Sequence, residues 1–214
     1  MNNCLVVMNA REIPICIESI RKLKIAKAWF RGYTEIELES VMPEWMKAHD
    51  FDNYIIISDD TTPTKEALAI IDGNMMDREI LTGWSNISPD SKLANLCYKP
   101  LMGSFPGAGS YKWTPIDMVL SMPTIFETFF MGFSLTAMRK HLWTRFPFKS
   151  WHQVKRVSGV LTTRGWGSDF MLSKRLRDSG IKMWCHKNGF VYHLASQENM
   201  IVGKVTPEVV FEQC

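Results

Sequence analysis

Two neighbouring aspartates, Asp59 and Asp60, come one residue after the apolar run Tyr54-Ile55-Ile56-Ile57, with Ser58 in between. A continuous apolar run is typical of a strand covered on both faces in a parallel sheet, and ligands of open α/β sheets bind beyond the carboxyl ends of the strands. Carboxylates placed there can hold a divalent ion that neutralises the charge developing on a diphosphate leaving group. The alternative is that both aspartates only cap the next turn or helix, because Asp is a favoured capping residue.

A second candidate site is the segment Arg164-Gly165-Trp166-Gly167-Ser168-Asp169. The glycines on either side of Trp166 leave room for its indole to present a flat face to a ligand. We expect Asp169 in the first turn of a helix, where its carboxylate could act as a general base that takes the proton of an attacking sugar hydroxyl. The alternative is that Ser168 and Asp169 cap the helix while Trp166 fills the core.

His193 lies on or just beyond the last apolar strand, in Val191-Tyr192-His193-Leu194. If this strand folds back beside the first aspartates, the imidazole could share a metal ion with them. A mixed carboxylate and imidazole set is compatible with Mn²⁺ or Mg²⁺, and imidazole favours the former. The alternative is a core histidine whose hydrogen bonds are satisfied by the protein.

The elements that must position these residues alternate between strands and helices along the first half of the chain. Pro14 is well placed to begin a helix, and the acidic residues after Tyr33 suit the first turn of another. Proline, glycine and serine accumulate between about residues 83 and 115, which indicates a long irregular connection. The alternation predicts an α/β fold. The expected strands are 5–8, 25–33, 54–57, 128–135 and 182–185, and the expected helices start at Pro14 and span 35–49, 65–71, 137–143 and 168–179.

Composition bounds the class of protein. The chain has 214 residues, 46% of them hydrophobic, which suffices for one domain with a sizeable core. The net charge of +3 is too small for a nucleic-acid binder. The five cysteines contain no C-x-x-C pair, which favours a reducing compartment. The amino terminus lacks the pattern of a signal peptide, and charged residues and a proline interrupt the apolar stretch 116–133. We therefore expect a cytoplasmic protein with no transmembrane segment and no nucleic-acid partner.

Taken together and in this order, these motifs resemble the GT-A glycosyltransferases, especially the large inverting glycosyltransferase family 2. Residues 54–68 are similar to the strand, the acidic DxD-type motif and the following helix of that family. Residues 129–140 resemble the strand and helix before the acceptor loop. Residues 165–180 resemble its G-W-G-x-[ED]-D-x-x-x-x-R-L-x-x-x-G segment, and residues 181–193 resemble its closing strands.

The resemblance implies a nucleotide-diphospho-sugar transferase fold, which is a Rossmann-like three-layer α/β/α arrangement with a mixed, mostly parallel central sheet. It implies one domain over residues 1–214, with a nucleotide-sugar-binding half at 1–82 and an acceptor-binding half at 83–214. The implied activity is transfer of a sugar from a nucleotide-sugar donor to a glycan, lipid or protein acceptor with inversion. The implied cofactor is Mn²⁺ or Mg²⁺.

The resemblance also implies roles for single residues. Asp169 is the implied catalytic base, and the implied metal ligands are Asp60 and His193. The nucleotide sugar would contact Asn9, Arg11, Asp59 and Arg164, and the acceptor would contact Gly165 and Trp166. Ordinary surface polarity remains the alternative for Asn9, Arg11 and Arg164.

Three departures from the family pattern matter. Ser58 stands at the first acidic position of a full D-x-D motif, and Ser168 stands where Glu or Asp is usual. The segment 28–32 replaces the family's Asp-x-Ser run near the base, so the nucleotide base cannot be named. Two rival functions remain: a nucleotide-sugar-binding module without activity, and a sugar-phosphate nucleotidyltransferase. The latter should carry a glycine-rich basic loop after its first strand, and Met8 to Glu12 is not such a loop.

Overall fold

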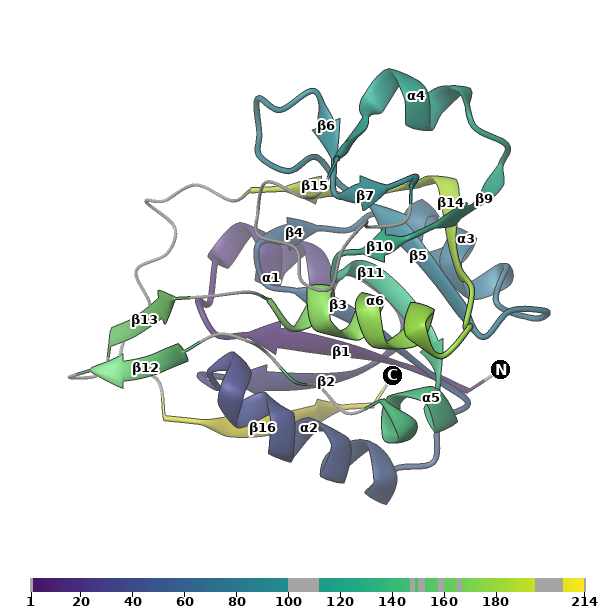
Figure 1. Ribbon diagram of the computed structural model, residues 1–214. Helices are drawn as coiled ribbons and strands as arrows, with labels where there is room; N and C mark the ends of the chain where they lie inside the picture. The colour runs from purple at the N-terminus through teal and green to yellow at the C-terminus, as the bar shows by residue number, and fades with distance from the viewer. Residues whose placement is uncertain are drawn as a thin grey trace.

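A computed structural model describes residues 2–99, 112–146, 149, 153–157, 160–164, 167–194 and 206–213. Its centre is an eight-stranded sheet with the order β16-β2-β1-β3-β11-β5-β14-β9 (Figure 1). The strands of this sheet are β1 (Asn3–Asn9), β2 (Ala26–Arg31), β3 (Asn53–Ser58), β5 (Ile80–Trp84), β9 (Ile125–Thr128), β11 (Ser134–Arg139), β14 (Met183–Phe190) and β16 (Glu208–Glu212).

The sheet is mixed. Strands β1, β2 and β3 run parallel to one another, and β5 runs parallel to β14. Strand β11 is antiparallel to both of its neighbours, β3 and β5, and so joins the two parallel groups. The outer strands β16 and β9 are antiparallel to β2 and β14. The fold is therefore mixed α/β, as predicted, with both edges formed by antiparallel strands.

Helices pack on both faces of this sheet. The alternating side chains of β1 show the two faces: Cys4 and Val6 belong to one core cluster, while Leu5 and Val7 belong to another. The first cluster includes residues of α2, α5 and α6, and the second includes residues of α1 and α3. In Figure 1, α6 lies in front of β1 and β3. The helices are α1 (Pro14–Arg21), α2 (Glu35–Ala48), α3 (Lys65–Gly73), α4 (Ile116–Ser121), α5 (Lys140–Arg145) and α6 (Ser168–Asp178).

Local sequence explains where α1, α2 and α3 begin. Pro14 occupies the first turn of α1, where its missing N–H costs no helical hydrogen bond. Thr34 caps α2 through a reciprocal capping box with Glu37. The hydroxyl of Thr64 accepts a hydrogen bond from the Ala67 N–H and caps α3. The predicted starts of these three helices are confirmed.

Short strands complete the structure. Strand β4 pairs with β15, β6 with β8, β7 with β10, and β12 with β13. The predicted irregular connection after residue 83 thus contains short paired segments. Among the described residues, no helix is long and apolar enough to cross a membrane. These strands are β4 (Thr61–Thr62), β6 (Leu93–Ala94), β7 (Leu96–Cys97), β8 (Thr114–Pro115), β10 (Phe130–Met131), β12 (Gln153–Val157), β13 (Val160–Arg164) and β15 (Tyr192–His193).

Two predicted elements are wrong in their bounds. The expected strand 128–135 is divided, because β10 ends at Met131 and β11 begins at Ser134. The expected helix 137–143 starts at Lys140, because the chain before it continues as β11. Tertiary pairing overrides helix propensity here, since β11 hydrogen-bonds to a strand on each side.

Candidate active site

The acid pair lies at the carboxyl ends of two parallel central strands. Strand β3 ends at Ser58, which is in register with Met8 near the end of β1. The Asp59 N–H donates a hydrogen bond to the Met8 carbonyl over 3.2 Å. Both carboxylates are buried, and the side chain of Asp59 is only 1% exposed. Buried carboxylates require partners, and the neighbouring segments supply them.

Arg11 is the main partner of the acid pair. Its Nη2 lies 2.7 Å from Asp59 Oδ1 and its Nη1 lies 2.8 Å from Asp60 Oδ2. The backbone N–H groups of Arg11 and Glu12 also donate to Asp59 Oδ2. Glu12 adopts a φ of 51°, an uncommon value for a residue other than glycine. Asp59 therefore fixes the loop after β1, and Arg11 links the two carboxylates.

His193 lies on the other side of Asp60. Strand β15 pairs with β4 so that His193 is opposite Thr61, and the Leu194 N–H donates to the Asp60 carbonyl over 2.7 Å. This pairing brings His193 Nε2 to 2.9 Å from Asp60 Oδ2. Its Nδ1 lies 3.0 Å from the Ile87 carbonyl oxygen. Since both ring nitrogens face acceptors, the imidazolium form satisfies both contacts.

Burial and charge shift the pKa values of these groups. Burial raises the pKa of Asp59, although Arg11 acts in the opposite direction. Burial also acts to raise the pKa of Asp60, but hydrogen bonds and charges from His193 and Arg11 outweigh it and hold that pKa below its usual range. For His193, burial acts to lower the pKa, but the contacts with Asp60 and the Ile87 carbonyl raise it above its usual value. Asp60 therefore stays charged at neutral pH.

Asp169 lies in the first turn of α6, half-buried, and its Oδ1 accepts a hydrogen bond from the Phe170 N–H over 2.8 Å. Ser173, four residues later on the same face of the helix, has its hydroxyl oxygen 3.2 Å from the Met131 nitrogen. Two residues beyond Met131, the Phe133 carbonyl accepts a hydrogen bond from the Ser58 N–H. This face of α6 therefore contacts the segment that borders the acid-bearing strand.

The remaining predicted acceptor residues are described only in part. Gly165 and Trp166 lie outside the described residues. Arg164 is the last residue of β13, where its backbone pairs with Gln153. Its side chain also lies outside the described part of the structure.

Asn9 lies at the end of β1 and lines a groove of about 380 Å³ between α1 and the strands β2 and β16. Its Oδ1 is buried, and the indole Nε1 of Trp29 is buried in the same wall. Neither atom has a hydrogen-bond partner in the described residues. The guanidinium carbon of Arg21 lies 5.9 Å from the Trp29 ring centroid. The groove thus lies beside the Arg11 loop, and the two unpaired polar atoms lie beneath its surface.

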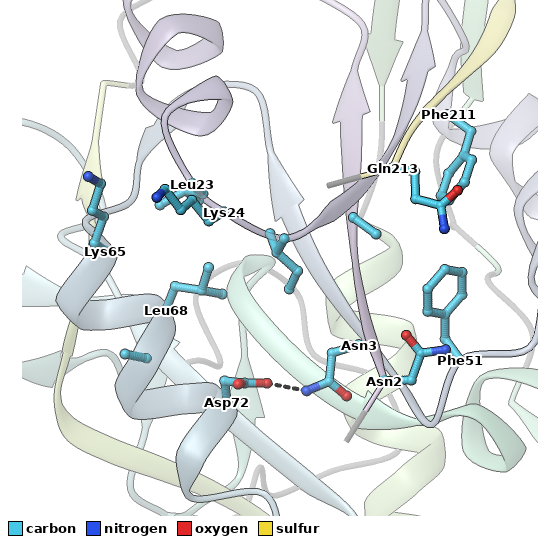
Figure 2. Close-up of a pocket in the computed structure, with 13 residues that line it drawn as sticks. Asn2, Asn3, Leu23, Lys24, Phe51, Lys65, Leu68, Asp72, Phe211 and Gln213 are labelled. Carbon is cyan, nitrogen blue, oxygen red and sulfur yellow. Dashed lines mark hydrogen bonds between the residues drawn. The ribbon is translucent and has the colours of Figure 1, made fainter.

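A larger pocket of about 610 Å³ lies at the opposite end of these strands. Figure 2 shows it beside the start of β1, with Asp72 hydrogen-bonded to Asn3. Its lining includes Leu23, Leu68 and Phe211. The pocket lies at the start of β1 and the acid pair lies at its end, so the pocket is not part of the same site.

Several contacts were not anticipated from the sequence. The Ser58 hydroxyl hydrogen-bonds to Asp60 Oδ1, and the Asn86 Oδ1 accepts a hydrogen bond from the His193 N–H. The contact of Ser58 could have been predicted from its position next to the acid pair in the sequence. Asn86 had none, because only the fold brings it beside His193.

The fit to a divalent ion depends on two side chains. Among the described residues, no group of three or more His, Cys, Asp and Glu side chains converges on one point. Asp60 and His193 do face each other, and the contact of Nδ1 with a carbonyl leaves Nε2 free to serve as a metal ligand once it is deprotonated. Mg²⁺ is commonly bound through one or two protein ligands plus substrate phosphates. The pair therefore fits an ion whose other ligands come from a diphosphate.

Comparison with known proteins relates this chain to others by structure alone. No protein-family profile and no curated protein matches its sequence. The crystal structure of A197 from STIV is similar with a TM-score of 0.56 and 8% identity, over 96% of this chain and 98% of that chain. The crystal structure of GalNAc-T7 with UDP, GalNAc and Mn²⁺ has a TM-score of 0.57 and 11% identity, over 92% of this chain and 43% of that chain. The fold is therefore GT-A-like.

Proposed function

We propose that this protein is a metal-dependent glycosyltransferase that moves a sugar from a nucleotide-diphosphate donor to an acceptor hydroxyl with inversion. The observation that carries the proposal is the contact between Asp60 and His193 at the carboxyl ends of the central strands. In a GT-A-like fold this edge is where a nucleotide sugar is expected. The similar GalNAc-T7 structure contains UDP, GalNAc and Mn²⁺.

In this proposal Asp60 and His193 hold Mn²⁺ or Mg²⁺. The bound ion would neutralise the charge developing on the diphosphate as it leaves. Asp59 and Arg11 help to seat the nucleotide. The base lies toward the groove beside Asn9, and this groove is open to solvent next to the Arg11 loop. Residues 1–82 then form the nucleotide-sugar half of a Rossmann-like α/β/α domain.

Asp169 is the proposed general base. The acceptor oxygen attacks the anomeric carbon, the bond from that carbon to the diphosphate oxygen breaks, and the acceptor proton passes to the Asp169 carboxylate. Support comes from the α6 face that carries Asp169 and Ser173, which contacts the segment next to Ser58. Arg164, Gly165 and Trp166 remain proposed acceptor-side or phosphate-side residues in the half formed by 83–214.

The decisive experiment measures nucleotide release from a panel of UDP- and GDP-sugars, with Mn²⁺ and with a chelator. We expect nucleotide release that depends on the metal. UDP-N-acetylgalactosamine is the first donor to test. Asp169→Asn should keep metal-dependent nucleotide binding but lose turnover by about 100-fold or more. Asp178→Asn is the matched control, since Asp178 lies at the other end of α6 and pairs with Lys174.

Other outcomes identify the rival functions. Metal-dependent binding of a nucleotide sugar without any release or transfer would indicate a binding module. Release of pyrophosphate from a nucleoside triphosphate and a sugar 1-phosphate would indicate a nucleotidyltransferase. Donor release that is unaffected by Asp60→Asn would refute the proposed metal site.

A further inference from the structure

Arg11 occupies the place that a divalent ion would take on Asp60. Its Nη1 lies 2.8 Å from Asp60 Oδ2, the same oxygen that lies 2.9 Å from His193 Nε2. Because Asp60 Oδ1 contacts the Ser58 hydroxyl instead, Oδ2 is the oxygen that an ion shared with His193 would use. Because a guanidinium and a metal cation repel each other, they cannot both contact Asp60 Oδ2 at close range.

The protein's own groups already neutralise the acid pair. Asp59 Oδ1 accepts from the Arg11 guanidinium, and Asp59 Oδ2 accepts from two backbone N–H groups. Asp60 Oδ1 accepts from Ser58, and Asp60 Oδ2 accepts from Arg11 and His193. Every carboxylate oxygen therefore has a donor from the protein. An entering ion gains less binding free energy here than at an unpaired carboxylate, because it must first displace the charge-assisted hydrogen bond from Arg11 to Asp60.

The guanidinium can release Asp60 while keeping Asp59. Its Nε lies 2.9 Å from Asp59 Oδ1 and its Nη2 lies 2.7 Å from the same atom. Only Nη1 contacts Asp60, and the Arg11 side chain is 20% exposed. A small rotation would thus turn Nη1 toward solvent, where a diphosphate oxygen could accept its hydrogen bond.

We propose that Arg11 competes with the divalent ion for Asp60, so that the ion binds tightly only together with a diphosphate that accepts the released guanidinium. This inference rests on the proposed function and deepens it. Arg11 is a positioning residue that couples metal binding to donor binding. By linkage, the ion must strengthen diphosphate binding by the same factor as the diphosphate strengthens binding of the ion.

Calorimetric titration of Mn²⁺, alone and in the presence of pyrophosphate, tests this coupling without any donor turnover. In the wild type, Mn²⁺ alone should bind weakly and pyrophosphate should strengthen its binding on the order of tenfold. In Arg11→Met, Mn²⁺ alone should bind about tenfold more tightly than in the wild type, and the strengthening by pyrophosphate should largely disappear. An Arg11→Met protein that binds Mn²⁺ no more tightly than the wild type overturns the inference.

Matched variants keep the test decisive. Arg31→Met removes the same charge from the end of β2, but Arg31 pairs with Glu12 and Glu208 and not with the acid pair. It should change Mn²⁺ affinity by less than about threefold, because only long-range screened charge is lost. If Arg11→Met does not fold, Arg11→Lys decides, since a lysine can pair with one carboxylate at a time and should give an intermediate increase. No increase in Arg11→Lys then overturns the inference.

Failure here is distinguishable from failure of the proposed function. If the wild type turns over a donor with metal while Arg11→Met shows no tighter Mn²⁺ binding, only the competition is wrong. If Asp60→Asn binds Mn²⁺ as well as Arg11→Met does, the ion does not use Asp60, and the proposed metal site and the competition are both wrong.

Discussion

Replacing Asp59 by alanine should destabilise the fold, although Asp59 lies in a loop. The substitution removes the acceptor of two backbone N–H groups, those of Arg11 and Glu12, and one of the two carboxylates that pair with the Arg11 guanidinium. A buried N–H left without a partner costs about 1–3 kcal/mol. Because the loop can relax toward water, we take the lower value for each, about 2 kcal/mol together.

The charge of Arg11 adds to this cost. Removing one partner of a buried ion pair costs about 3–5 kcal/mol, but Asp60 still pairs with the guanidinium and Arg11 is 20% exposed. We therefore add about 1 kcal/mol, which gives a total loss of about 3 kcal/mol in the free energy of unfolding. For a chain of this size, that loss lowers the melting temperature by about 6–12 °C.

Chemical denaturation of the metal-free protein measures this loss directly. Glu44→Ala is the control, because Glu44 pairs with Lys47 on an exposed helix face and should change stability by less than about 0.5 kcal/mol. A loss below about 1 kcal/mol for Asp59→Ala would show that the Asp59 contacts do not hold the loop after β1.

Three further predictions follow from the fold and from titration. Gly83→Ala should cost about 2 kcal/mol or more in unfolding free energy, because its Cβ would lie 2.3 Å from the Gly189 backbone oxygen. Its control is Gly73→Ala in helix α3, which should be neutral or stabilising because a new Cβ there would have nothing within 4 Å. Equal losses in the two variants would contradict the close approach of Gly83 to Gly189. Thr34→Ala should cost about 1 kcal/mol through loss of the capping box, measured by the same denaturation, whereas no loss would mean that the box contributes nothing. In an NMR titration of the metal-free protein, His186 should titrate below its ordinary pKa, because burial and the charge of Arg78 lower it, and His193 should titrate above its own. The stabilisation from His193 is then complete below its unfolded-state pKa and is lost as pH rises through its folded-state pKa. His186 acts in the opposite direction, since it reduces stability as pH falls through its unfolded-state pKa. If His186 titrated at a higher pH than His193, both assignments would be refuted.

The sequence predicted the elements whose signals are local. Pro14, Thr34 and Thr64 mark helix starts through the chemistry of their own side chains or ring. The apolar run in β3 reflects burial on both faces and is confirmed. Strand β11 could not be predicted in its extent, because residues 136–138 form a strand only by pairing with β3 and β5. The outer strand β16 was likewise not predicted, and it is held by pairing with β2.

The candidate site was predictable only in part. The end of an apolar strand correctly places Asp59 and Asp60 at the carboxyl edge of the sheet. The approach of His193 was a conditional expectation, and pairing of β15 with β4 produces it. The bridge formed by Arg11 was not foreseen, because it depends on the positive φ of Glu12 and on a side-chain path that no spacing encodes. The roles of these residues in binding and catalysis remain predictions.

The backbone of the acid pair itself, residues 58–60, is held by hydrogen bonds that do not involve the acidic side chains. Ser58 N donates to Phe133 O, Asp59 N donates to Met8 O, and Leu194 N donates to Asp60 O. These main-chain bonds come from three separate parts of the chain and do not require a carboxylate. Protein engineers could therefore exchange the side chain at position 60 for a different ligand type and expect the new group to start from the same place in space. A set of variants at position 60 would then show how metal preference depends on the ligand type while the backbone stays the same.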